Sequence, residues 1–225
     1  DLKFYRLRYS HEEVKRISSL IPRSTVLERE KASEDLVKSD NLADYKIIHF
    51  AAHGLIDDQK PARSAIILTL DNDPAEDGFL QMREVFNLKL NADLVVLSSC
   101  QTGLGQFIKG EGIEGISRAF FYAGSSSVVM SLWTINDQIS AQFMERFYYH
   151  LKGTENLAEA LRQVKLEMIE SDIVSHPYYW AGFILSGDGS TRVFQPVFNK
   201  ALIGLATAFT GLALTAFIFR KKLLN

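Results

Sequence analysis

One histidine and the only cysteine of the chain carry the residue types of a nucleophilic dyad. His53 follows the apolar run 45–50, and Cys100 follows a second apolar run, 94–97. The reactive form of cysteine is the thiolate, so a catalytic cysteine needs a nearby base to take its proton. If the two runs are neighbouring parallel strands, their carboxyl ends bring both side chains to one edge of the sheet. We therefore predict His53 as the general base and Cys100 as the nucleophile.

Glycines beside the histidine and the cysteine suit the same chemistry. Gly54 follows His53 directly, and Gly103 lies three residues after Cys100. Glycine lets backbone N–H groups turn toward the oxyanion of a tetrahedral intermediate. We therefore expect the N–H groups of Gly54 and Cys100 to form an oxyanion hole. The alternative is structural, because a lone cysteine in an apolar context often serves as a small buried hydrophobe.

The elements that must position this dyad read as an α/β fold. Short runs rich in Val, Ile and Leu alternate with longer segments of helical periodicity, as in a sheet with helices on its faces. The runs 45–50 and 94–97 are nearly continuous in apolar residues, which predicts central parallel strands. The predicted strands are 25–27, 46–50, 65–70, 94–98, 127–132 and 181–186. The predicted helices are 11–19, 31–38, 81–88, 114–123, 137–151 and 156–170.

The composition indicates one globular domain that is not a nucleic-acid binder. Of the 225 residues, 47% are hydrophobic and 23% charged, and residues 1–195 are enough to build a single core. Four basic residues and no acid follow residue 195, which leaves 21 basic against 27 acidic residues and a net charge of −6 in this domain. Binding to phosphates needs clustered Lys and Arg, so DNA and RNA are not expected as partners.

Neither a metal site nor an organic cofactor is expected. A single cysteine excludes an internal disulfide and a cysteine-rich zinc site. His49 lies four residues before His53, but the later histidine is past the end of the strand, so we expect His49 to be a core histidine. The segment 71–78 is dense in turn formers and predicts a hairpin tip, because its spacing does not match a calcium loop. The glycine-containing loop 103–112 lacks the Gly-Lys-Ser/Thr ending of a phosphate loop.

The last segment has the sequence of a transmembrane helix. Residues 201–219 include no charged side chain and are long enough to cross most of the hydrocarbon core of a bilayer. Lys200 and the basic run 220–222 flank it, where cationic side chains reach the headgroups. We therefore expect a single-pass membrane protein with a globular domain at 1–195 and a membrane segment at 196–225. A buried core helix is the alternative.

The side of the membrane on which the domain lies stays open. The positive-inside rule places the basic tail in the cytoplasm and the domain outside, whereas a tail-anchored protein would keep the domain in the cytoplasm. The chain begins with Asp1 and not with Met, so we expect a processed chain or a fragment.

Seven segments closely resemble motifs of one family, the CHAT domain, a caspase-like domain often attached to tetratricopeptide repeats. They occur in the family's order between about Arg6 and Gly187. The segments are His49-Phe-Ala-Ala-His53-Gly54, Ala92-Asp-Leu-Val-Val-Leu-Ser-Ser-Cys100-Gln-Thr-Gly103, Gly110-Glu-Gly112, Arg118-Ala-Phe-Phe-Tyr-Ala-Gly124, Ser131-Leu-Trp133, Ala158-Glu-Ala-Leu-Arg162 and His176-Pro-Tyr-Tyr-Trp180.

The resemblance implies a caspase-like, mostly parallel sheet and a cysteine endopeptidase of the caspase and separase clan. The family's dyad maps onto His53 and Cys100, which lie 47 residues apart, near the spacing of about 50 in caspases. It also implies a protein substrate, an acyl-enzyme intermediate and activity controlled by attached tetratricopeptide repeats or a partner sensor. The family's sheet starts with a strand upstream of the segment that begins at Phe4, and we expect this sequence to lack that strand. The alternatives are a catalytically silent scaffold and an acyltransferase with the same dyad.

Two residues are candidates for the substrate pocket, Ser98 and Asp137. Caspases carry Gln-Ala before the nucleophile, whereas Ser98 and Ser99 precede Cys100, which argues against a preference for Asp in the substrate. The stretch 132–137 resembles the Leu-Trp-x-Val-x-Asp motif of separases, so by resemblance Asp137 accepts the cation of a substrate arginine. Asp137 also begins a predicted helix, where a carboxylate can instead cap exposed N–H groups.

Overall fold

A four-stranded sheet forms the centre of the computed structural model, which describes residues 6–57, 60–69, 76–98, 111–153 and 156–194. Its strand order is β1-β5-β6-β7. The first three strands are parallel, and β7 is antiparallel to β6. The strands are β1 (Ile47–Phe50), β5 (Leu94–Leu97), β6 (Ser127–Ser131) and β7 (Phe183–Gly187). The predicted parallel pairing of the two apolar runs is confirmed. Of these two strands, however, only β5 is central, because β1 is an outer strand of the described sheet.

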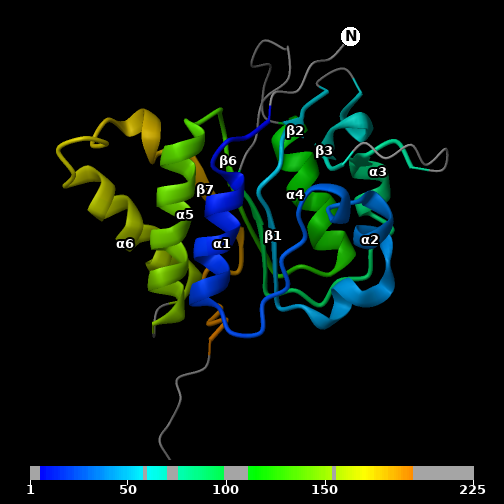
Figure 1. Cartoon of the computed structure of the whole chain (residues 1–225), viewed down its shortest axis with the longest axis horizontal. Coiled ribbons are helices and arrows are strands. Elements are labelled where there is room, and N and C mark those ends of the chain that lie inside the picture. Colours follow the sequence, from blue (N-terminus) through cyan, green and yellow to red (C-terminus); the bar gives the residue numbers. More distant parts are fainter. Residues whose placement is uncertain (1–5, 58–59, 70–75, 99–110, 154–155, 195–225) are drawn as a thin grey trace, which may run out of the picture. The chain divides into compact units, whose positions relative to one another are not determined.

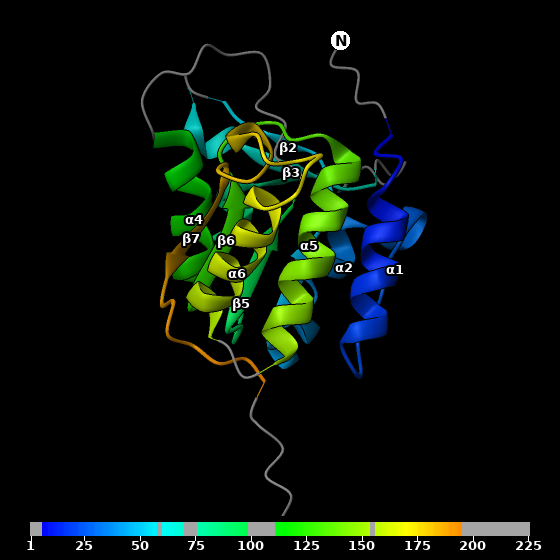
Figure 2. The ribbon, with the colours of Figure 1, turned by 90° about the vertical axis from the view of Figure 1, so that its left-hand side faces the viewer.

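A smaller antiparallel sheet follows β1 directly. It contains β2 (Gly54–Leu55), β3 (Ala65–Ile67) and β4 (Phe79–Gln81), and it lies at one end of the four-stranded sheet (Figure 2). The strands on either side of the predicted hairpin tip, β3 and β4, are antiparallel neighbours as expected, and residues 70–75 of that segment lie outside the described residues. The strand predicted at 65–70 is shorter than expected and ends at Ile67.

Helices cover both faces of the large sheet (Figure 1). On one side lie α1 (Ser10–Leu20), α5 (Asp137–Lys152) and α6 (Leu157–Ile169), and on the other α2 (Glu34–Lys38), α3 (Met82–Val85) and α4 (Glu111–Ala123). Alternation along β1 separates the two cores, because Ile48 and Phe50 face α4 while Ile47 packs with α1 and α5. Short 3₁₀ helices occur at Arg29–Lys31, Asp40–Asp44, Pro61–Arg63 and Pro177–Tyr179.

Three predicted elements need correction. The strand predicted at 25–27 is wrong, because the structure assigns it no strand and leaves Val26 and Leu27 39% and 41% exposed. Strand propensity without a covered face and a ladder partner does not make a strand. The helix predicted at 31–38 starts later, since the Ser33 hydroxyl accepts a hydrogen bond from the Leu36 N–H and caps α2. The helix predicted at 81–88 is confined to α3.

The described residues contain no helix that could span a membrane. None of their helices combines the length and the hydropathy needed to cross a bilayer. The predicted transmembrane segment 201–219 and its basic tail lie outside the described residues.

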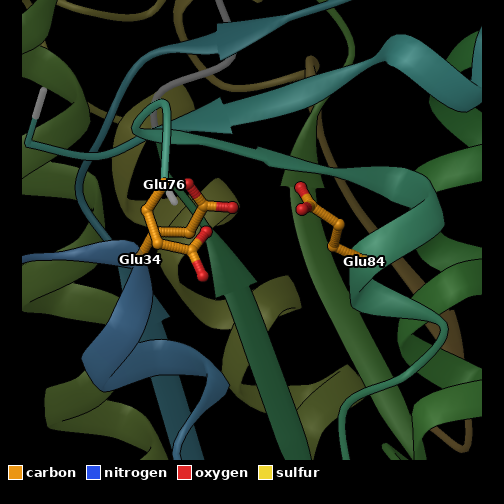
Figure 3. A group of neighbouring side chains, drawn as sticks. All are labelled: Glu34, Glu76 and Glu84. Atoms are coloured by element: carbon orange, nitrogen blue, oxygen red, sulfur yellow. The ribbon is translucent and has the colours of Figure 1, made fainter. Parts of the chain in front are cut away.

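Lys38 joins the smaller sheet to α2 and α3. Its ammonium lies 2.7 Å from a Glu34 oxygen, 2.6 Å from Glu76 and 2.8 Å from Glu84, and Figure 3 shows that these carboxylates come from separate segments. Glu34 is 2% exposed, and its second oxygen accepts a hydrogen bond from the Gly78 N–H at 3.0 Å. One cation therefore holds three chain segments around β4.

The charges of this cluster depend on one another. Burial acts to lower the pKa of Lys38, but hydrogen bonds to the three carboxylates raise it well above its usual value. Burial raises the pKa of Glu34, with Lys38 acting against that rise. Burial also acts upward on Glu84, yet hydrogen bonds from Lys38 and the Gln81 N–H lower its pKa overall.

Replacing Lys38 by Met is expected to lower the free energy of unfolding by about 2 to 3 kcal/mol at pH 7, because half-buried carboxylates lose their counter-charge. In the unmodified protein, folding raises the pKa of Lys38 above its usual value of about 10.5. Its contribution to stability is therefore complete below about pH 10.5 and is lost only as the pH rises through the higher pKa of the folded state. The effect of the substitution should shrink as the pH falls and the carboxylates take up protons, Glu34 with its raised pKa before Glu84 with its lowered pKa.

Denaturant unfolding at several pH values measures this loss. Lys46→Met is the matched control, because Lys46 is 55% exposed and lies 3.6 Å from Asp93, so its loss should stay within about 1 kcal/mol. Equal effects of the two substitutions at pH 7 would contradict the proposed weight of the Lys38 cluster.

Candidate active site

His53 lies three residues beyond β1, where the chain passes from the large sheet into the small one. Its side chain is buried, with 8% of the residue exposed. The His53 carbonyl accepts a hydrogen bond from the Ile67 N–H of β3 at 2.8 Å. The backbone of the predicted base is therefore held by the smaller sheet, while β1 fixes the chain that leads to it.

The strand that precedes the predicted nucleophile ends beside β1. In the parallel register Phe50 lies opposite Leu97, and the Phe50 carbonyl accepts the Ser98 N–H at 3.1 Å. The Ser98 carbonyl accepts in turn from the Ser140 hydroxyl of α5 at 2.9 Å. Cys100 itself lies outside the described residues, so its distance from His53 stays a prediction.

The register of β2 and β3 fixes the direction of the Gly54 N–H. Residues of antiparallel strands alternate between hydrogen-bonded and non-hydrogen-bonded pairs. The bond from Ile67 to His53 makes that pair hydrogen-bonded, so Gly54, opposite Ile66, belongs to a non-hydrogen-bonded pair. Its N–H consequently points away from β3, as a donor to an external oxyanion must.

Ser98, a candidate pocket residue, is enclosed. It is 2% exposed, and its hydroxyl lies 3.5 Å from the Phe50 carbonyl. Both of its backbone polar groups are used, by Phe50 and by Ser140. These contacts tie the end of β5 to β1 and α5.

Asp137 does not cap α5. The cap is Asn136, whose side-chain oxygen accepts the N–H groups of Gln138 and Ile139 at 3.0 and 3.3 Å. The predicted capping role of Asp137 is therefore wrong. Asp137 is the first helical residue, and its Oδ2 accepts the Tyr9 N–H at 2.7 Å. Its Oδ1 is buried and has no hydrogen-bond partner among the described residues.

The loop between β6 and α5 is held by aromatic residues. The Trp133 indole N–H donates to the Tyr178 carbonyl at 2.9 Å, and the Tyr178 hydroxyl donates to the Thr134 carbonyl at 2.7 Å. The two rings stack with centroids 6.3 Å apart. Gly182 leaves room for the indole, since a Cβ there would lie 2.8 Å from it. His176 supports the turn before Tyr178, because its Nδ1 accepts the Tyr178 N–H.

Sequence reasoning missed a buried polar group behind β1. His49 is the core histidine that was predicted, but its partners lie far away in sequence. Its Nε2 is 2.7 Å from a Glu13 oxygen, and its Nδ1 is 3.1 Å from the Tyr148 hydroxyl. Glu13 and Tyr148 are both fully buried. The only sequence signal is an acid on the otherwise apolar face of the predicted helix 11–19.

A carboxylate cluster with metal-like spacing also escaped prediction. Within the described residues, Glu34, Glu76 and Glu84 place ligand oxygens within 4.8 Å of one another. The Lys38 ammonium already lies 2.6 to 2.8 Å from one oxygen of each. Since it supplies the positive charge that these acids need, the cluster serves to join segments of the fold.

Comparison with known proteins places the chain in a family. The CHAT domain family model matches residues 1–188. Two curated relatives are Tetratricopeptide repeat protein 28 of Mus musculus and of Homo sapiens, each 35% identical over 140 residues. The alignment covers 60% of this chain and 5% of either relative, so the chain spans a small part of their length. Since the family model covers most of its residues, this chain belongs to the CHAT domain family.

Proposed function

We propose that this chain is a cysteine endopeptidase that cleaves protein substrates with a His53-Cys100 dyad. CHAT family membership supports a caspase-like fold. The observation that carries the proposal is the bond between the Phe50 carbonyl and the Ser98 N–H. It joins two parallel strands at the edge where the chain continues to His53 on one side and to Cys100 on the other.

The proposed reaction is acyl transfer to the thiol. His53 takes the proton of the Cys100 thiol as its sulfur attacks the carbonyl carbon of the scissile peptide. The N–H groups of Gly54 and Cys100 stabilise the oxyanion of the tetrahedral intermediate. The carbon–nitrogen bond breaks as His53 returns the proton to the leaving amine. Water, activated by the same imidazole, then hydrolyses the thioester and frees the second product.

We also propose that the domain works within a larger, membrane-tethered protein. The relatives are named for tetratricopeptide repeats, which supports an upstream repeat array or partner sensor that controls the protease. The uncharged segment 201–219 with its basic flanks supports a single-pass tether. The charge bias of those flanks favours a cytoplasmic tail.

Replacing Cys100 by Ala or His53 by Ala is expected to lower proteolysis about a thousandfold or more while the fold is retained, because dyad members act as a unit. Peptide cleavage and covalent labelling by a thiol-reactive peptide electrophile measure the loss. Since the chain has one cysteine, labelling reports on a single sulfur.

His11→Ala is the matched control for the histidine, because that side chain is 57% exposed and lies on α1. It should keep the rates of the unmodified protein. A Cys100 thiol that reacts no faster than the cysteine of a short peptide would instead favour a silent scaffold. Labelling without sequence-selective cleavage would favour an acyltransferase.

Replacing Asp137 by Asn tests whether its carboxylate reads a basic residue before the cleaved bond. The amide oxygen of Asn can still accept the Tyr9 N–H, so stability should hardly change. The negative charge is lost, so a preference for Arg or Lys should fall at least tenfold relative to Leu. Initial rates on matched peptides with Arg, Leu or Asp at that position measure the ranking.

Asn136→Ala is the neighbouring control for this substitution. It removes the helix cap and should lower the free energy of unfolding by about 1 kcal/mol without changing the ranking of the peptides. An unmodified enzyme that prefers Leu or Asp would contradict the pocket role of Asp137.

Removing the residues after Gln195 is expected to convert a chain that needs detergent into one that is soluble and still labelled at Cys100, because the apolar segment is then absent. Extraction with and without detergent, followed by labelling, measures both properties. Aggregation of the shortened chain would indicate that the segment belongs to the core.

A further inference from the structure

A fully buried carboxylate on α1 holds a histidine of β1. The Glu13 Oε1 lies 2.7 Å from His49 Nε2, and the side chains are 0% and 10% exposed. The other imidazole nitrogen lies 3.1 Å from the Tyr148 hydroxyl of α5. The second Glu13 oxygen is buried and has no hydrogen-bond partner among the described residues. The pair therefore crosses from α1 to β1, and the tyrosine continues it to α5.

One assignment of the ring proton of His49 gives both of its nitrogens a matching partner. Burial, and then the negative charge of Glu13, raise the pKa of Tyr148 well above its usual value, so its hydroxyl keeps its proton and can donate to His49 Nδ1. With the ring proton on Nε2, His49 donates a hydrogen bond to the Glu13 carboxylate and accepts one from the Tyr148 hydroxyl. Both ring nitrogens are thereby engaged, and the imidazole has one orientation.

Stability alone does not account for such a group. The cluster around it is otherwise apolar and includes Ile17, Leu94 and Phe147, and apolar side chains of similar volume often stabilise a core as well as a buried ion pair does. What a directional bond adds is a single arrangement of the elements that it joins.

The elements joined here are those that lead to the dyad. His49 is followed by Phe50, whose carbonyl accepts the Ser98 N–H, and the Ser98 carbonyl accepts from Ser140 of α5. Tyr148 belongs to the same helix α5. Polar links thus join α1, β1, β5 and α5 directly before the segments that carry His53 and Cys100.

We propose that Glu13 is a positioning residue, which sets through His49 the end of β1 and with it the place of His53. A displacement of α1, the first described helix, would then be transmitted to the imidazole. The catalytic consequence rests on the proposed function. The placement of His53 does not, and it can be measured in an inactive protein.

Glu13→Gln in the full chain tests this proposal, because Gln keeps the size and loses the charge. The five histidines are labelled in the ring, and His53→Gln assigns the His53 resonance. We expect the His49 and His53 ring resonances both to move in Glu13→Gln. Amide hydrogen exchange at residues 50–53 should become at least tenfold faster.

Arg16→Gln is the matched control, since it breaks an exposed ion pair of 2.7 Å between Arg16 of α1 and Glu145 of α5. It should leave the His53 resonance unchanged. Tyr148→Phe keeps the ring and removes the hydroxyl on the other side of His49. It should also move the His53 resonance, so it tests the link even in the case that Glu13→Gln does not fold. A His53 resonance that stays in place while that of His49 moves overturns the proposal, as does an equal shift in Arg16→Gln.

Labelling of Cys100 separates this inference from the proposed function. In an active protein, Glu13→Gln should slow labelling by the peptide electrophile at least tenfold at temperatures where both proteins are folded. An unchanged labelling rate overturns the catalytic part. Slow labelling of the unmodified chain counts against the protease, and the position of the His53 resonance then still decides whether Glu13 places that imidazole.

Discussion

The parallel pairing of β1 with β5 is the constraint on which the rest of this domain depends. It sets Ile47 opposite Leu94 and Phe50 opposite Leu97, and it continues past the strands in the bond from Ser98 to Phe50. A register shift by one residue would exchange the two faces of β1, so Phe50 would leave the core on the α4 side. Apolar packing on both faces thus fixes the register of the two strands. The same packing determines where their carboxyl ends lie, and with them any groups that act at that edge.

Sequence reasoning works best here where the physical cause is local. The helices α1, α5 and α6 lie within two residues of their predicted ends, because apolar spacing along one helix decides them. The apolar runs before His53 and Cys100 likewise gave correct strands. The run 25–27 also consists of residues that are common in strands, yet the structure assigns no strand there. Composition identifies a possible strand, whereas a ladder partner and a covered face decide whether it forms.

The candidate site was predictable only in its outline. Both strand ends follow from the chain pattern, but the roles of single polar side chains depend on partners far away in sequence. Asp137 misses the capping position by one residue, because Asn136 is the cap, and its carboxylate instead accepts the N–H of Tyr9, 128 residues away. Glu13 and Tyr148 are 36 and 99 residues from His49. Sequence periodicity does not reveal such pairs. It identifies the apolar face of each helix or strand, whereas the polar contacts form only when these elements pack together.

The buried polar groups of this fold divide into two kinds with different consequences. Around Lys38, charges at the border of the small sheet join α2, α3 and the segment before β4, next to apolar core residues such as Val37 and Val85. Around His49, the polar link lies within a complete apolar core, where it is not needed for burial. The Lys38 ammonium is a point charge that contacts three carboxylates at once, whereas a planar imidazole bound at both nitrogens also has a fixed ring orientation. The second arrangement is the one suited to the proposed site, because acyl transfer needs its groups placed to well within about 1 Å.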